Sequence, residues 1–145
     1  MAFLSSLNIS GSALTAQKFR MEIASHNMAN IDSVGGDTPY RRKMVVLSER
    51  TSTPRFDREL DRATRTVNRL SGVEVTAILE DTEYVKLEYD PTNPLANEDG
   101  YVEKPDINML EEMVDMMSAS RSYEANVTVF NAVKQMAAKA LEIGK

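Results

Sequence analysis

Few side chains in this 145-residue sequence could take part in catalysis or ligand binding. The chain has no cysteine, which excludes a disulfide, a zinc–thiolate site and a cysteine nucleophile. Its single histidine, His26, has no second histidine three or four residues away to complete a metal site on a helix. The six glycines form neither a GxGxxG nor a GKT pattern, so no phosphate-binding loop is expected. We therefore expect no enzymatic activity, no metal, no cofactor and no small-molecule substrate.

Two segments are rich in acidic residues, but neither has the spacing of a known cation-binding site. Residues 90–100 read DPTNPLANEDG, yet the calcium-loop pattern D-x-[DN]-x-[DN]-G is not met and two prolines interrupt the segment. Residues 57–61 place three acids among arginines, which predicts solvated ion pairs. We expect no ion-binding role for either segment.

Arginines recur along residues 54–70 at steps of 3, 4, 3 and 4, which would form a basic ridge on one side of a helix. Four threonines in or beside the segment weaken the helix prediction, so its conformation stays open. A nucleic-acid partner is not expected, because the net charge is −5, aromatic residues are 6% of the chain and no nucleic-acid module is recognisable. The arginines that we expect to make electrostatic contacts are Arg41, Arg42, Arg55, Arg58, Arg62, Arg65 and Arg69.

The net charge hides a polarity along the chain. Residues 40–70 carry nine basic and four acidic groups, for a net +5, whereas residues 71–115 carry two basic and thirteen acidic groups, for a net −11. These blocks are either solvated faces of one domain or complementary surfaces that meet, within the chain or between copies.

The N-terminal part, from about Leu7 to Asn30, contains no proline and is predicted to be a helix. It carries two apolar groups on roughly opposite sides, which predicts a helix buried from two sides. One group is Leu7, Leu14, Met21 and Met28, and the other is Ile9, Ala16, Phe19 and Ile23. Asn27 and Asn30 are expected to satisfy backbone groups where this helix ends.

The C-terminal part, from about Asn108, has the strongest helix signal. Its residues step by 4 and 3 over more than four heptads, capped by Asp106 or Asn108. The row is Met109, Met113, Met116, Ser120, Tyr123, Val127, Phe130, Lys134, Ala137 and Leu141, and a second apolar line on the opposite face is Ala125, Val129, Ala132 and Met136. Nine methionines in all favour adaptable contacts, so these rows fill either an intramolecular core or subunit interfaces.

The middle part contains strand-like segments. Residues 43–49, 72–80 and 84–89 are rich in β-branched and aromatic residues, while residues 90–105 are predicted to be a turn-rich loop. The fold class is therefore α+β, with long N- and C-terminal helices pairing as a coiled-coil-like layer around a small β-rich middle domain. The expected parts are an N-terminal helical arm (1–35), the β-rich domain (36–105) and a C-terminal helix (106–145).

The N-terminal region resembles the flagellar axial proteins, the family of rod, hook and hook-associated proteins. Their S/A-x-N-[IL]-A-N motif has its counterpart at Ser25–Asn30, where His26 replaces a common Asn and Asp32-Ser33 follow in place of Asn-Thr. Further strings resemble the proximal-rod members of that family almost from end to end. They are Pro39–Arg42, Gly72–Val75, Tyr89–Pro91, Asp99–Val102 and Asn108–Phe130.

The resemblance implies a structural subunit of the bacterial flagellar basal body, located in the periplasmic rod. It implies helical assembly, with the terminal helices in an inner layer and the β-rich domain outside. The implied partners are other copies, the other proximal and distal rod proteins, a rod-base adaptor, and the MS-ring and export-gate base. Export would use the flagellar type III apparatus without a cleaved signal peptide, and no basic and apolar leader opens the sequence.

Apolar positions of both helices, with the two asparagines, are the expected subunit interface. They are Leu7, Leu14, Met21, Asn27, Met28, Asn30, Met109, Met113, Met116, Tyr123, Val127 and Phe130. The alternative function is a soluble helical adaptor or export chaperone that acts as a discrete dimer, because such a protein would show the same paired helices.

Overall fold

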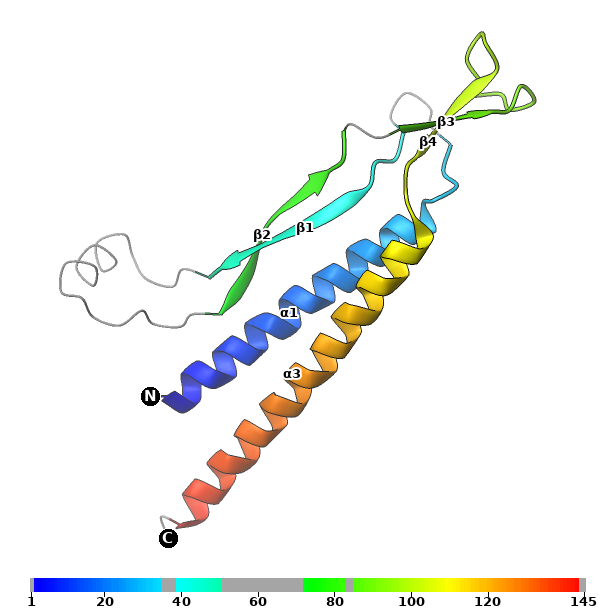
Figure 1. Ribbon diagram of the computed structural model, residues 1–145. Helices are drawn as coiled ribbons and strands as arrows, with labels where there is room; N and C mark the ends of the chain where they lie inside the picture. The colour runs from blue at the N-terminus through cyan, green and yellow to red at the C-terminus, as the bar shows by residue number, and fades with distance from the viewer. Residues whose placement is uncertain (1, 35–38, 51–71, 83–84, 144–145) are drawn as a thin grey trace, which may run out of the picture.

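The computed structural model describes residues 2–34, 39–50, 72–82 and 85–143, and consists of two long terminal helices with two small antiparallel hairpins between them in sequence (Figure 1). The elements in chain order are α1 (Ala2–Ala29), β1 (Lys43–Glu49), β2 (Val73–Glu80), β3 (Val85–Tyr89), β4 (Tyr101–Pro105) and α3 (Met109–Ile143). This arrangement confirms the predicted α+β class with paired terminal helices. The segment 54–70, with Arg55, Arg58, Arg62, Arg65 and Arg69, lies outside the described residues.

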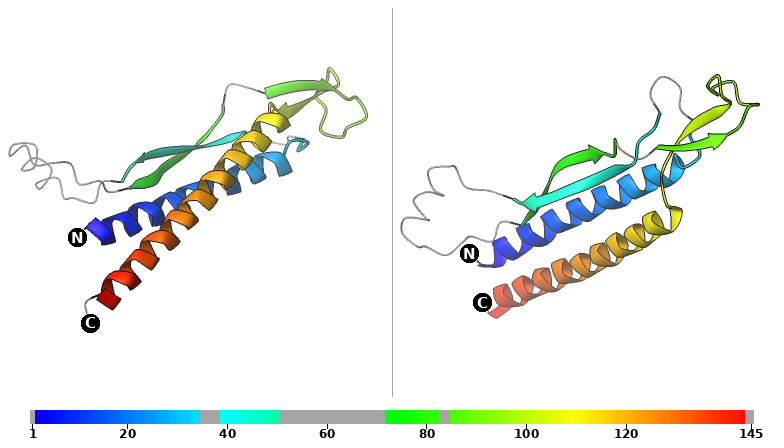
Figure 2. Two further views of the ribbon diagram at one scale, coloured as in Figure 1. Left: turned by 60° about the horizontal axis from the view of Figure 1, so that its bottom comes forward. Right: turned by 45° about the horizontal axis from the view of Figure 1, so that its top comes forward.

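The helices α1 and α3 run antiparallel, so both chain ends lie at the same end of the helix pair (Figures 1 and 2). At 1.5 Å per residue, 28 residues of α1 and 35 residues of α3 extend for roughly 42 Å and 52 Å. None of the described helices is long and apolar enough to cross a membrane.

Small and polar residues form the face of α3 that packs on α1. Glu112, Ala119 and Val133 are buried at steps of 7 and 14, and α1 is the described helix or strand against which α3 packs. Ala119 is fully buried opposite a helix whose own buried residues include Ala16 and Ala24. The side of α3 that faces α1, which we call the seam, therefore differs from the predicted row. Four residues of the row are half-buried along the seam: Met116, Tyr123, Phe130 and Ala137. Met113 of the predicted row is exposed.

The helix α1 is buried from two sides, as its two apolar groups predict. It packs on α3 and also on both strands of the β1–β2 hairpin. Ser12 fixes the far end of that hairpin, because its Oγ accepts a hydrogen bond from the amide of Val73 at 3.1 Å and donates one to the carbonyl of Ile9 at 2.8 Å. The helix α3 has no described strand on its outer side, so among the described elements only α1 covers it.

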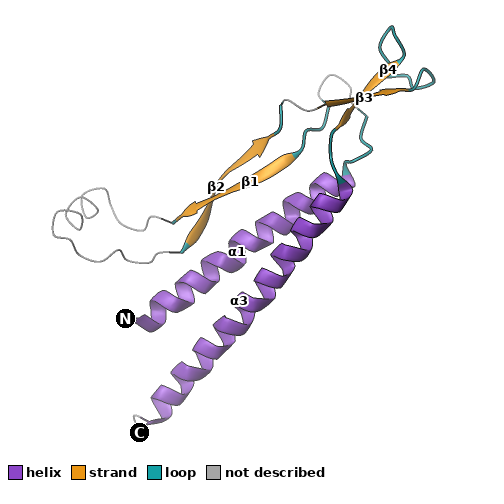
Figure 3. Ribbon diagram, in the orientation of Figure 1, coloured by secondary structure: helices purple, strands orange, loops and turns teal. Residues whose placement is uncertain are grey.

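The strands pair in two separate hairpins (Figure 3). Strand β1 pairs with β2 from Lys43 opposite Glu80 to Glu49 opposite Val73, with an irregularity between Val46 and Leu47. Strand β3 pairs with β4 from Val85 opposite Pro105 to Tyr89 opposite Tyr101.

The prediction of a loop was wrong for residues 101–105, which form strand β4. The signal was weak because the strand is only five residues long, holds two charged residues and ends in proline. Its partner decides its conformation: the rings of Tyr89 and Tyr101 meet edge to face with centroids 5.3 Å apart, and Val102 is buried.

Gly72 gives a test of how the β1–β2 hairpin is fixed to α1. Its φ is +96°, and a Cβ there would lie 2.2 Å from the Ser12 Oγ. We expect Gly72→Ala to lower the free energy of unfolding by about 1–3 kcal/mol, through backbone strain and the displaced serine. Urea unfolding followed by far-UV circular dichroism measures this change.

Gly11→Ala is the matched control, since a Cβ at this helical position meets nothing within 4 Å. It should raise the free energy of unfolding by about 0.5–1 kcal/mol. Equal effects of the two substitutions would contradict the role given to Gly72.

Candidate assembly surface

A buried polar cluster joins α1, the start of β1 and the start of α3; we call Asn27, Tyr40, Arg42, Lys43 and Glu112 the polar clasp. Asn27 is 1% exposed and all its hydrogen-bonding groups have partners. Its Nδ2 donates to the Lys43 carbonyl at 2.8 Å and to Glu112 Oε2 at 3.0 Å. Its Oδ1 accepts from the Tyr40 hydroxyl at 2.9 Å and from the Lys43 amide at 3.0 Å. One side chain therefore fixes three segments.

Glu112 brings a carboxylate into this cluster, with only 3% of the residue exposed. A buried charge is tolerated where it is paired and its oxygens are hydrogen-bonded. The Arg42 Nε donates to Glu112 Oε1 at 2.7 Å, while Asn27 satisfies Oε2. Burial alone would lower the pKa of Arg42, but the hydrogen bond and charge of Glu112 outweigh it and raise that pKa.

The end of α1 and the start of α3 are capped beside the clasp. Asn30 Nδ2 donates to the His26 carbonyl at 2.8 Å, as expected for a residue that satisfies the helix end. Asn27 instead serves the backbone of Lys43, sixteen residues away in sequence. Asn108 Oδ1 accepts from the Leu110 amide at 3.0 Å, which confirms one of the two predicted caps of α3.

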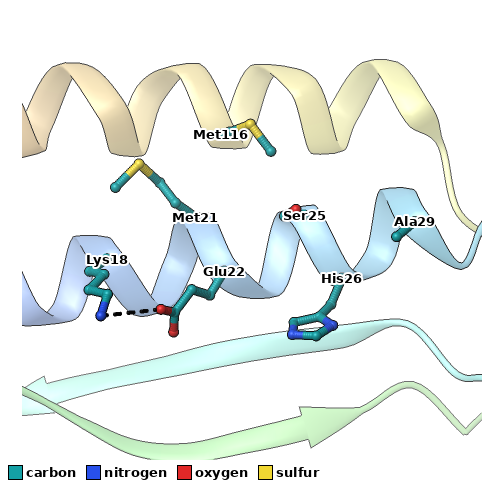
Figure 4. A pocket seen from close by; sticks show the side chains of 7 residues that line it. All are labelled: Lys18, Met21, Glu22, Ser25, His26, Ala29 and Met116. Atoms are coloured by element: carbon teal, nitrogen blue, oxygen red, sulfur yellow. Dashed lines mark ion pairs between the residues drawn. The ribbon is translucent and has the colours of Figure 1, made fainter.

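Apolar residues of the two helices meet across a groove further along the pair. In Figure 4, Met21 reaches from α1 toward α3, and Met116 lines the same groove from α3. The rim carries an ion pair between Lys18 and Glu22 at 3.4 Å. His26 also lines the groove, and the described residues include no cluster of side chains that could hold a metal ion.

The described basic and acidic residues meet within the chain. Lys43 pairs with Glu80 at 3.5 Å, and Arg20 pairs with Asp115 at 3.9 Å. Arg41 Nη1 donates to the Thr82 carbonyl at 2.7 Å. With Arg42 in the polar clasp, both predicted contact arginines of the described region have partners in their own chain.

The outer face of α3 exposes large apolar side chains, which is the main feature of the molecular surface. Leu110 is 73% exposed and Met117 is 51% exposed, and Val114 lies between them on the same face. We call Leu110, Val114, Met117, Val129 and Met136 the outer row of α3; each is exposed. The predicted residues Met109 and Met113 are exposed beside this row.

The sequence prediction found only the second half of the outer row. Steps of 4 and 3 join Leu110, Val114 and Met117. The twelve residues from Met117 to Val129 cover three turns and about a third of a turn more, so Val129 and Met136 lie beside this line and do not continue it. That signal was missed because Met109, Met113 and Met116 form an apolar line at the same spacing beside these residues. Among the expected interface residues, Leu7, Leu14, Met21 and Met28 are half-buried and Asn27 is buried.

Known proteins similar to this chain decide its family. Residues 98–143 match the C-terminal domain of the flagellar basal-body rod FlgEFG proteins. The chain is 49% identical to the flagellar basal-body rod protein FlgC of Bacillus subtilis, over the whole length of both. It belongs to the FlgC family. The FlgC protein of Salmonella typhimurium is 44% identical over both full lengths, and that of Borreliella burgdorferi is 40% identical over 99% of this chain and 98% of its own.

Membership of the FlgC family confirms three predictions made from the sequence. The chain is a structural subunit of the flagellar basal-body rod, it is not an enzyme, and its place is the basal body. The family also decides against the alternative of a soluble adaptor or export chaperone. The assignment of individual residues to subunit interfaces stays a prediction.

Asn27→Ala tests the polar clasp. The substitution leaves groups of Tyr40, Lys43 and Glu112 without their partner, so we expect a loss of about 2–3 kcal/mol in the free energy of unfolding. Chemical denaturation measures it. Asn30→Ala removes one hydrogen bond at the helix end and should cost about 0.5–1 kcal/mol. A loss at Asn27 no larger than that at Asn30 would show that the clasp adds little stability.

Tyr40 predicts a pH dependence at the alkaline end. Burial, then the charges of Glu112 and Glu80, raise its pKa above the ordinary value of 10.0. A raised native pKa favours the fold in the protonated state, so this contribution is fully present below pH 10 and is lost as the pH rises through the native pKa. Unfolding of the wild type and of Tyr40→Phe, compared between pH 8 and 11, should show their stability difference shrinking above pH 10. A constant difference would contradict the shift.

Proposed function

We propose that copies of this chain assemble helically through the outer row of α3, and that the resulting rod acts as the drive shaft that carries torque across the periplasm. The observation that carries the proposal is the imbalance of apolar surface. Among the described residues, six apolar side chains are buried, whereas eighteen large apolar side chains are exposed, eight of them on α3. The described part of the chain therefore buries few of its large apolar residues and leaves many of them in water, which favours a subunit that completes its core by assembly.

The outer row can hold neighbours together strongly. Each Leu, Val or Met side chain that becomes fully buried contributes about 1.5–3 kcal/mol, so a few such residues per contact offset the cost of association. A contact between different faces of two copies does not close on itself and continues as a helical polymer. Torque then passes through many packed side chains rather than through one bond.

The proposed interface extends the set predicted from the sequence. Met109 and Met113 lie beside the outer row, where a neighbouring helix would cover both together with Leu110. The half-buried residues Tyr123, Val127 and Phe130 border the intramolecular seam and would meet a neighbour at its edge. Leu7, Leu14, Met21 and Met28 would contribute where they are not covered by α3.

We propose the same division of the chain as the sequence suggested. The arms 1–35 and 106–145 form the inner layer of the rod, and the β-rich part 36–105 lies outside it. The proposed partners are copies of this chain, the other proximal and distal rod proteins, a rod-base adaptor, the MS-ring and export-gate base, and the type III apparatus during export. The packing of the β1–β2 hairpin on α1 supports this division, since neither described hairpin packs on α3 and its outer side is left for neighbours.

Met117→Asp tests the outer row. A carboxylate there would be buried at the proposed contact without a partner, while in the free subunit it stays in water. We expect incorporation into isolated basal bodies and swimming motility to be lost, with less than about 0.5 kcal/mol change in the stability of the free subunit.

Thr82→Asp is the control, because it adds the same charge at an exposed position away from α3. It should leave incorporation and motility intact. Motile cells that carry Met117→Asp would count against packing through this face.

A further inference from the structure

The β3–β4 hairpin carries a second apolar surface. Residues directly opposite in an antiparallel pair share a face, so Leu87 and Glu103 lie on the same side as Tyr89 and Tyr101. We call these four residues the hairpin face. Leu87 is 59% exposed and Tyr89 is 63% exposed, and Tyr101 and Glu103 are exposed as well.

Among the described residues, the hairpin face is exposed toward the turn of the hairpin, whereas Pro105 on the same side at the other end is buried. Val102 points to the opposite side from the hairpin face and is 1% exposed, so that side is covered within the chain. Glu88 lies on the same side as Val102 and pairs with Lys104 at 2.7 Å. The hairpin face is therefore the open side of a two-stranded sheet, with two tyrosines and a leucine in water.

The surroundings of the hairpin face are acidic. Residues 85–106 contain six acidic and two basic side chains, and one of the lysines, Lys104, is paired with Glu88. Exposed tyrosine rings beside carboxylates fit arginine, because a guanidinium stacks on the ring and donates to the carboxylate. The chemistry of this face therefore points to an arginine-rich peptide segment.

The chain itself contains such a segment at residues 51–71. Its sequence holds five arginines and three acids, with Phe56, Leu60, Val67 and Leu70 among them. It has the positive charge and the guanidinium groups that the hairpin face lacks, and apolar side chains that could pack on Leu87. Its chemistry is taken from the sequence, since it lies outside the described residues.

The two features belong to opposite ends of the β1–β2 hairpin. The segment 51–71 leaves β1 after Arg50 and returns at Gly72, where the Arg50 amide donates to the Gly72 carbonyl at 2.9 Å. The β3–β4 hairpin lies beyond the other end of β1 and β2, as Figures 1 and 2 show. A contact between the two features of different copies would run head to tail and would continue from copy to copy.

We propose that the hairpin face of one copy binds the arginine-rich segment 51–71 of the next copy. The inference rests on the proposed assembly of copies into a rod and adds a second contact, separate from the outer row of α3. In this contact, arginines stack on Tyr89 and Tyr101 and pair with Glu103 and its acidic neighbours. Apolar side chains of the segment contact Leu87.

Mixing two variants tests this contact. The first variant, Leu87→Ser with Tyr89→Ser, loses the hairpin face; the second, Arg58→Glu with Arg62→Glu, loses the basic segment. All samples, including the parent, also carry Met117→Asp, which removes packing through α3. Sedimentation of the full chain at low salt, over a range of concentrations, should show the parent forming oligomers of increasing mass, and each variant alone associating at least tenfold more weakly. An equimolar mixture should form dimers and stop there, because each variant keeps one intact surface.

Three results would overturn the proposal. A parent that does not associate with rising concentration would show that the segment does not bind a second copy. The same result would be seen if the segment bound the hairpin face of its own chain. A mixture that stays monomeric would show that the two surfaces do not meet. Variants that associate as well as the parent would place the contact elsewhere.

Ile78→Ser is the control, since Ile78 is exposed on β2 and lies outside the hairpin face. It should leave association unchanged. A negative result here would leave the proposed assembly through α3 standing. That assembly is tested separately, by the effect of Met117→Asp on incorporation into basal bodies, with the hairpin face and the segment 51–71 unchanged.

Discussion

The burial of the Glu112 carboxylate joins the end of α1, the start of β1 and the start of α3. A charge in that environment is stable only with partners on both oxygens, and these come from Arg42 near the start of β1 and from Asn27 near the end of α1. Asn27 can serve Glu112 only at one axial position of the two helices, so the register of α1 against α3 is set there. Its other two bonds with Lys43 hold the first residue of β1 against the helix pair.

The fold that results covers its two helices unequally. The helix α1 lies between α3 and the β1–β2 hairpin, whereas the outer side of α3 has no described strand upon it. The seam between the helices uses small residues such as Ala24 and Ala119, which allow close approach, and the larger Leu110, Val114 and Met117 point away from it. The apolar content of the chain is thus divided between a thin internal core and a broad external face. That division is what a subunit of a continuous polymer requires.

The sequence predicted both helices, the first three strands and the two-sided burial of α1, because each of these rests on periodicity or on local composition. It did not predict which side of α3 faces α1. A glutamate such as Glu112 is expected at the surface, and only its contacts with Asn27 and Arg42 explain its burial. Strand β4 was missed for a similar reason: Tyr101–Pro105 is a strand only because Val85–Tyr89 pairs with it. Contacts between distant residues decide these features, and local pattern carries little trace of them. The residues proposed for assembly depend on neighbours in the same way.

The bond between Asn27 and Glu112 joins residues 85 positions apart. Contacts of such long sequence separation close late, because the entropy of the intervening loop must be lost before they form. During synthesis, the first helix has no access to its longest partner until nearly the whole chain has left the ribosome. Chain order therefore delays completion of the fold until translation is almost finished, so a partly synthesised chain cannot form the helix pair.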